Sequence, residues 1–200
     1  MSIREELKKR ILVIDGAMGT MVQRHKLTEE DYRGKRFANW HTDVKGNNDL
    51  LCITQPEIIT GIHLQYLEAG ADIIETNTFS STSIAMADYD MQELAYELNV
   101  AAVKCVREAI NQYKSKHPNT TEKYIAGSIG PLNKTLSLSP DVNNPGYRAV
   151  TFDEVVVAYT EQIKGLDEAG VDVLLVETIF DTLNAKAAIF AIKEYYRKIG

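Results

Sequence analysis

The chain has 200 residues, of which 44% are hydrophobic and 25% charged, a composition typical of a folded globular protein rather than a disordered one. Its 22 basic and 28 acidic residues give a net charge of -6, which disfavours nucleic acid as a partner. No apolar stretch suits a membrane span, and residues 1–10 resemble neither a secretory signal nor a lipid anchor. We therefore expect a cytoplasmic protein with no membrane partner.

The first half of the chain contains two predicted strand-and-helix units. Residues 11–14 form a short apolar run that ends at a turn, which is typical of a strand buried on both faces. A helical apolar pattern follows over 56–69. A second apolar run over 71–75 predicts another strand, and a long amphipathic pattern predicts a helix over 92–115.

The second half repeats this alternation. Residues 124–128 and 171–176 are apolar runs that predict two further strands. Between them, Thr151 and Glu154 have the spacing of a capping box, which predicts the start of a helix. A last helix is predicted over 185–198.

Alternating strands and helices predict a parallel sheet, either open and doubly wound or closed as a barrel. Gly16-Ala17-Met18-Gly19 after the first strand does not match the GxGxxG fingerprint of the doubly wound alternative. We therefore predict a TIM-type parallel (β/α) barrel. A complete barrel takes roughly 250 residues and eight strands, so residues 1–200 are expected to form one partial domain, a half barrel of about four βα units that ends after the fourth helix. Its uncovered strand edges predict self-association.

Polar residues gather where the predicted strands end, and in parallel barrels the loops after the strands form the active site. Two acids at these positions, Asp15 and Glu177, would give a shared cavity that suits an ammonium group or a metal. The complete set is Asp15 with Gly16 to Thr20, then Thr76, Asn77 and Thr78, then Ser128, Gly130 and Asn133, and finally Glu177 with Thr178.

Each of these features also has a purely structural interpretation. Asp15 before Gly16 is ordinary turn chemistry, and Glu177 is also compatible with a structural ion pair. The backbone N–H groups of Gly16 and Ala17 could form an anion-binding nest, although a GxxG spacing is common in tight turns. The residues alone leave these alternatives open.

Five segments in order resemble the homocysteine-binding domain of cobalamin-dependent methionine synthases, and the likeness extends over nearly the whole chain. The segments are IDGAMGTM at 14–21, KGNND at 45–49 with ITQP at 53–56, GADIIETNTF at 70–79, GPLNKTLS at 130–137 and VETIFDT at 176–182.

The resemblance implies a zinc-dependent S-methyltransferase. Homocysteine thiolate would attack a methyl group on cobalamin, which methyltetrahydrofolate recharges. Asp15 and Glu177 would hold the substrate ammonium group, and backbone N–H groups of Gly16 and Ala17 its carboxylate. Thr76 and Asn77 complete the expected substrate-binding set. A free thiol is mostly protonated at neutral pH, so zinc would supply the thiolate.

The chain departs from this family at the metal. The family's zinc is held by three cysteines from later strands, and neither Cys52 nor Cys105 matches their motifs. We therefore expect no catalytic residue, no zinc and no cobalamin on these 200 residues, which would be inactive alone and would need the other half of the barrel and the cobalamin and folate modules. Alternatives are a homocysteine methyltransferase that uses betaine or S-methylmethionine, and a non-catalytic half barrel that acts as a binding or folding module.

Overall fold

A computed structural model describes residues 2–200. Its sheet is parallel, with the strands in the order β1-β2-β3. Ile73 pairs with Tyr124 in the first ladder, and Ala126 pairs with Val173 in the second. The strands are β1 (Ile73–Glu75), β2 (Tyr124–Ile129) and β3 (Val173–Val176). Three of the four predicted strands are therefore present, each near its predicted position.

The prediction of a doubly buried strand over residues 11–14 is wrong. This segment contributes only an isolated parallel bridge from Ile14 to Ile73, and the Val13 carbonyl accepts hydrogen bonds from the backbone of β1 and the residue before it. Ile11 is 87% exposed and Val13 54% exposed. Because the segment lies at the edge of the sheet and pairs on one side only, its apolar side chains are not covered by a neighbouring strand.

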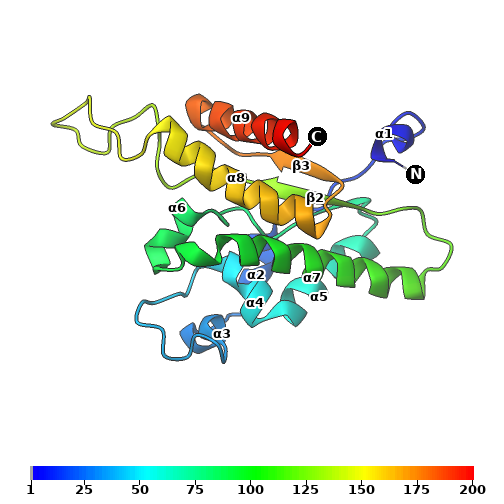
Figure 1. Ribbon diagram of the computed structural model, residues 1–200. Helices are drawn as coiled ribbons and strands as arrows, with labels where there is room; N and C mark the ends of the chain where they lie inside the picture. Colours follow the sequence, from blue (N-terminus) through cyan, green and yellow to red (C-terminus); the bar gives the residue numbers. More distant parts are fainter. Residues whose placement is uncertain (1) are drawn as a thin grey trace.

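The helices follow the predicted pattern and are joined by shorter helical turns (Figure 1). The helices of eight or more residues are α5 (Pro56–Glu68), α7 (Ala95–Lys116), α8 (Phe152–Ala169) and α9 (Thr182–Ile199). The short helices are α1 (Ile3–Glu6), α2 (Met18–Gln23), α3 (Glu29–Arg33), α4 (Leu51–Thr54) and α6 (Ser83–Met86), and the 3-10 turns are η1 (Asn48–Leu50), η2 (Ala87–Tyr89) and η3 (Gln92–Leu94).

Local sequence explains the ends of two helices. The predicted capping box begins α8, because the Thr151 side chain accepts from the Glu154 backbone N–H while the Glu154 carboxylate accepts from that of Thr151. Helix α9 starts three residues before its predicted first residue at 185. The Asp181 side chain accepts from the Leu183 backbone N–H and so caps the helix earlier than the apolar pattern alone indicates.

Consecutive strand order determines where the helices lie. The order is the Ile14 bridge, β1, β2 and β3, with no reversal. Right-handed crossovers that always step in the same direction place every helix on the same side of the sheet. Accordingly α5, α7, α8 and α9 pack in that sequence as a continuous layer alongside the strands (Figure 1). A complete doubly wound sheet has a reversal of strand order and helices on both faces; the strands of residues 2–200 show no such reversal.

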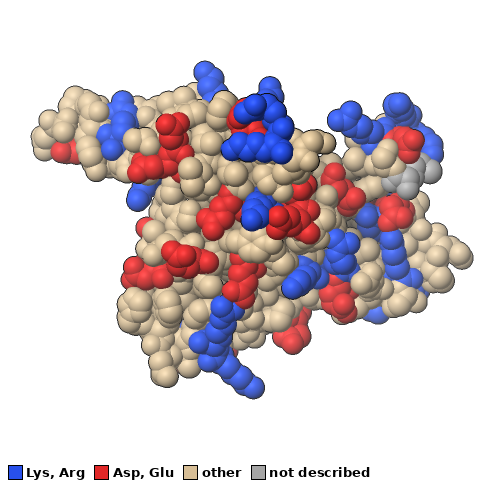
Figure 2. Space-filling model, viewed as in Figure 1, with Lys and Arg blue, Asp and Glu red and all other residues tan. Residues whose placement is uncertain are grey.

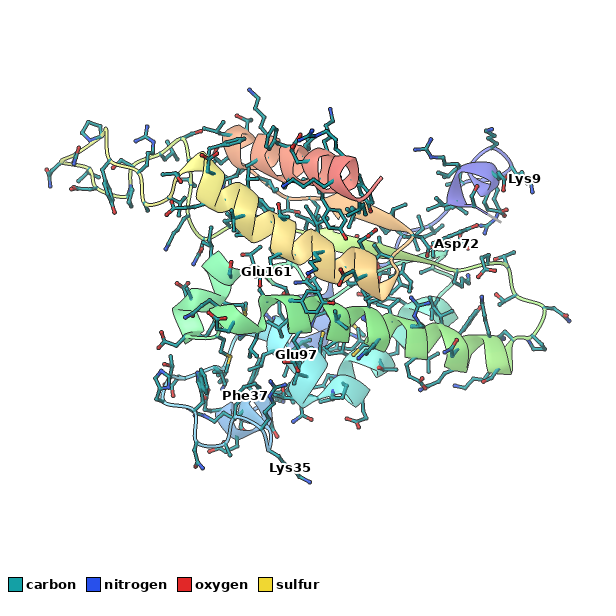
Figure 3. All side chains as sticks on the ribbon, viewed as in Figure 1. Lys9, Lys35, Phe37, Asp72, Glu97 and Glu161 are labelled. Carbon is teal, nitrogen blue, oxygen red and sulfur yellow. The ribbon has the colours of Figure 1, made fainter. Side chains whose placement is uncertain are left out.

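A charged cluster closes the amino-terminal end of the sheet. Asp72 accepts hydrogen bonds from Arg10 at 2.8 and 3.1 Å, from Lys123 Nζ at 3.3 Å and from the Val13 N–H at 3.1 Å. Figure 3 labels Asp72 at this end of the sheet, near the segment that leads from α1. The cluster fixes residues 10–13 against β1. It thereby orients the segment that leads to Asp15 at the carboxyl end of the sheet.

Elsewhere the surface carries mixed charge. On the face shown in Figure 2, Lys and Arg side chains alternate with Asp and Glu side chains over the long helices. Among residues 2–200, no helix combines the length and apolar character needed to cross a membrane.

Candidate functional site

A cavity of about 520 Å³ opens at the carboxyl ends of the strands. Its wall is formed by residues that follow the Ile14 bridge, β1, β2 and β3, together with the turn before η1. The lining residues are Asp15, Gly16, Ala17, Met18, Gly19, Gly46, Asn48, Asp49, Glu75, Thr76, Asn77, Phe79, Ser80, Ser128 and Glu177. All six residues expected to bind substrate are among them, so the structure brings together positions that are distant in the sequence.

Three carboxyl groups from different strand ends meet in this cavity. The Glu75 backbone N–H donates to Asp15 Oδ1 at 3.0 Å, which fixes the aspartate beside β1. The Ser128 hydroxyl at the end of β2 donates to Glu177 Oε1 at 2.5 Å, and the Glu177 N–H donates to the Ile129 carbonyl at 3.1 Å. The regular ladder thus sets the position of each acid.

The backbone after β3 is strained where it turns away from the cavity. Thr178 has a φ of 53°, in the left-handed region that β-branched residues rarely adopt. Its hydroxyl donates to Glu177 Oε2 at 3.4 Å. Strained residues of this kind persist where the surrounding structure fixes them, often at functional sites. Here the turn directs the chain outward directly after the acid that faces the cavity.

Burial and mutual repulsion oppose ionisation of the acids. Burial, with a smaller contribution from the charge of Glu177, raises the pKa of Asp15 to about 7. Burial, followed by the charges of Glu177 and Asp15, raises the pKa of Glu75 to about 7. Near neutral pH the cavity therefore holds protons that an incoming cation can replace.

Gly16 and Ala17 form the rim beside Asp15. Within residues 2–200 their backbone N–H groups donate to no protein acceptor, so they are free to bind an anion. The Tyr66 hydroxyl donates to the Ala17 carbonyl at 3.2 Å and so anchors this turn to α5. Tyr66 carbon and oxygen atoms lie 3.3 Å from the position of a Cβ on Gly16, so a larger residue there would press on the anchor.

Thr76 and Asn77 use their side chains to hold the loop after β1. The Thr76 hydroxyl accepts from the Ser128 N–H at 3.0 Å and bonds the Thr78 hydroxyl at 2.7 Å. Asn77 Nδ2 donates to the Asn48 carbonyl at 2.7 Å. Both residues line the cavity, and their protein contacts show that they also shape it.

A buried acid within η1 joins this 3-10 turn to the same loop. Asp49 Oδ1 accepts from the Ser81 hydroxyl at 2.7 Å and from the Ser80 N–H at 3.0 Å. Burial raises the pKa of Asp49 despite these bonds. The interaction holds one wall of the cavity, and it is not evident from the sequence because the partners lie about thirty residues apart.

Five residues of the predicted strand-end set lie outside the cavity lining, namely Thr20, Thr78, Gly130, Asn133 and Thr178. Asn133 donates to Asp88 Oδ2 at 2.7 Å and lines a smaller, adjoining depression. At Gly130 a Cβ would come within 2.3 Å of the Phe79 carbonyl oxygen, so only glycine allows this close approach. Gly130 therefore packs against a residue of the cavity wall, because Phe79 lines the cavity.

Glu75 is the acid that the sequence analysis missed. It is the last residue of β1, directly before Thr76, and it lines the cavity with Asp15 and Glu177. The same strand-end argument that selects Glu177 would have selected Glu75 if the predicted strand had been ended one residue earlier.

The residues present do not fit a zinc–thiolate site. Cys52 on α4 and Cys105 on α7 are buried thiols that do not themselves line the cavity. Asn77 Nδ2 lies 3.5 Å from Cys52 Sγ, and burial raises the pKa of this thiol. Within residues 2–200 no group of three or more His, Cys, Asp or Glu side chains has the geometry of a metal site.

Parallel strands that alternate with helices and lead to a polar cavity define this protein as an α/β protein. A family model described as homocysteine S-methyltransferase matches residues 12–199. The chain belongs to the homocysteine S-methyltransferase family.

Solved structures with the same fold include the homocysteine methyltransferase MmuM from Escherichia coli. Its metallated form matches with a TM-score of 0.74 and 23% identity, over 98% of this chain and 63% of that one. Its apo form matches with a TM-score of 0.66 and 22% identity, over 98% and 60%. At this identity the likeness establishes the shared fold, and the chain spans less than two thirds of these relatives.

Proposed function

We propose that this chain is the homocysteine-binding part of an S-methyltransferase and that the acidic cavity binds the amino-acid end of the substrate. Asp15 and Glu177 would bind the ammonium group, and the free N–H groups of Gly16 and Ala17 would bind the carboxylate. The observation that carries the proposal is the meeting of Asp15 and Glu177 in one cavity beside these N–H groups. Thr76 and Asn77 would complete the wall.

The charge pattern supports a zwitterionic ligand. The acidic side chains of Asp15, Glu75 and Glu177 and the backbone of Gly16 and Ala17 line the same cavity. An α-amino acid carries an ammonium group and a carboxylate on the same carbon, so its two charges would meet opposite partners a short distance apart. Hydrogen bonds to charged groups each contribute about 1.5–3 kcal/mol.

Binding can be tested by calorimetric titration of the chain with L-homocysteine. We expect Asp15→Asn and Glu177→Gln to weaken affinity by about 10- to 100-fold, which corresponds to the loss of one charge-assisted contact. Glu30→Gln is the matched control, because Glu30 is an exposed acid on α3, away from the cavity. Equal affinity for the two cavity variants and the control would overturn the assignment.

For the whole protein we propose transfer of a methyl group from methylcobalamin to the homocysteine thiolate, with zinc bound outside these 200 residues and methyltetrahydrofolate as the source of the methyl group. The resemblance of residues 45–49 and 130–137 to cobalamin-dependent methionine synthases supports this donor. These 200 residues would be a half barrel that binds substrate without turnover. Supplying the whole protein with homocysteine and either methylcobalamin, betaine or S-methylmethionine tests the donor; methionine formed from betaine would contradict the proposal.

A further inference from the structure

Glu75 belongs to a cluster of carboxyl groups at the strand ends. Glu75, Asp15 and Glu177 line the same cavity, where the Glu75 backbone N–H donates to Asp15 Oδ1 at 3.0 Å and the Ser128 hydroxyl donates to Glu177 Oε1 at 2.5 Å. Burial, followed by the charges of Glu177 and Asp15, raises the pKa of Glu75 to about 7. In the free protein this cluster therefore holds a proton near neutral pH.

The cavity lining supplies no fixed positive charge to this cluster within residues 2–200. The cavity lining contains the acids Asp15, Asp49, Glu75 and Glu177 and, among residues 2–200, no Lys, Arg or His. Asp49 already accepts two hydrogen bonds from the loop after β1.

The adjoining elements bring two further titratable groups near this end of the cavity. Burial and the charge of Asp15 raise the pKa of the Tyr66 phenol on α5. The charge of Arg24, which follows α2, opposes this increase. Neither residue lines the cavity. Neutralisation of the clustered carboxyl groups is therefore left to a proton or to an incoming cation.

We propose that Glu75 is a third amine-binding residue of this cavity and that a proton held by the cluster of Asp15, Glu75 and Glu177 leaves for solvent when a substrate ammonium group enters. The ammonium group takes the place of this proton, so its positive charge offsets the negative charge that the cluster gains on deprotonation. This inference rests on the proposed function and adds to it a proton exchange at a named cluster.

The exchange also defines the ligand class. An ammonium group brings its own positive charge and several donors, whereas an N-acylated amine is neutral and cannot replace the proton. The cavity is therefore expected to select free α-amino acids. N-acetylmethionine should bind at least about 100-fold more weakly than methionine, as expected for the loss of charge-assisted contacts.

The test is calorimetric titration of the chain with L-methionine, which has no thiol to titrate. Titrations at pH 6.5 in two buffers of different ionisation enthalpy give the number of protons released for each ligand bound. Wild-type protein is expected to release protons on binding. Glu75→Gln is expected to release about half as many protons per ligand as the wild type, or fewer. Affinity in the wild type should also rise with pH, by up to about 10-fold per unit for each linked proton.

Two controls separate this inference from a general loss of structure. Glu30→Gln should release as many protons as the wild type, and Glu75→Asp, which retains a carboxyl group, should restore part of the release. If Glu75→Gln binds methionine and releases as many protons as the wild type, the inference fails and the proposed function stands. If the wild type binds neither methionine nor homocysteine, both fail.

Discussion

The backbone N–H of Glu75 donates a 3.0 Å hydrogen bond to Oδ1 of Asp15, a residue that precedes it by sixty positions. This bond brings the end of the first strand segment to the end of β1 and places two acids beside Glu177. The fold therefore holds carboxyl groups together against their repulsion. Such a concentration of like charge favours ligand binding and lowers stability in the absence of ligand.

Asp15→Asn is expected to stabilise the free protein at alkaline pH. Burial raises the pKa of Asp15 from 3.8 to about 7, so the folded state binds more protons than the unfolded state between these values. The contribution of Asp15 to the free energy of unfolding therefore decreases as pH rises through this window. After allowance for partial exposure, the gain of the variant over the wild type should grow by about 1–2 kcal/mol between pH 4 and pH 8.

Urea unfolding at these two pH values measures that gain. Asparagine retains the oxygen that accepts the Glu75 N–H, so the change removes charge with little change of shape. The exposed control Glu30→Gln should show no comparable pH dependence. A variant that is less stable than the wild type at pH 8 would contradict the prediction.

His63 is expected to make the fold sensitive to acid. It is fully buried on α5, its ring nitrogens have no hydrogen-bond partner within residues 2–200, and burial lowers its pKa from 6.5 to about 3. The unfolded state then binds the proton first, so stability decreases as pH falls below 6.5. Between pH 6.5 and pH 5 the loss should be about 2 kcal/mol.

Replacing the histidine with leucine tests the source of this loss. His63→Leu cannot be protonated, so its stability should change less over the same pH interval, as measured by guanidinium unfolding. His25→Leu provides a control at an exposed histidine. Parallel pH profiles for His63→Leu and the wild type would rule out His63 as the acid-sensitive group.

Asp72→Asn should destabilise the fold by about 3 kcal/mol at pH 7, because it leaves Lys123 buried without its carboxylate partner. Burial opposes ionisation of Asp72, but hydrogen bonds from Arg10, the Val13 N–H and Lys123 together lower its pKa to about 2. The stabilisation is thus present above pH 3.8 and lost as pH falls toward 2. Asp153→Asn, at an exposed position on α8, is the control for urea unfolding at pH 7; equal midpoints would count against a stabilising cluster.

Gly130→Ala should reduce both stability and ligand affinity. The new Cβ would lie 2.3 Å from the Phe79 carbonyl oxygen, so the backbone on the wall of the cavity would have to move. Overpacking of this kind costs about 1–3 kcal/mol. Gly61→Ala on α5, where a Cβ meets nothing within 4 Å, is the matched control. A thermal midpoint for Gly130→Ala at or above that of the wild type would refute the close contact.

Much of the fold could be predicted from local sequence. The limits of α5 follow from Pro56 and the apolar spacing after it, and the start of α8 follows from the capping box of Thr151 and Glu154. The first strand could not be predicted in the same way. Residues 11–14 have the apolar pattern of an interior strand, but whether a neighbouring strand covers them is not a local property.

The sequence by itself determined the alternation of strands and helices, the positions of Asp15 and Glu177 at strand ends and the family to which the chain belongs. Only the tertiary structure decided that Glu75 joins these acids, that Asp49 binds the loop after β1 and that the buried His63 ring has no hydrogen-bond partner within residues 2–200. The reason is physical: apolar period and capping act over a few residues, whereas burial, repulsion and hydrogen bonding depend on groups that folding brings together from distant parts of the chain.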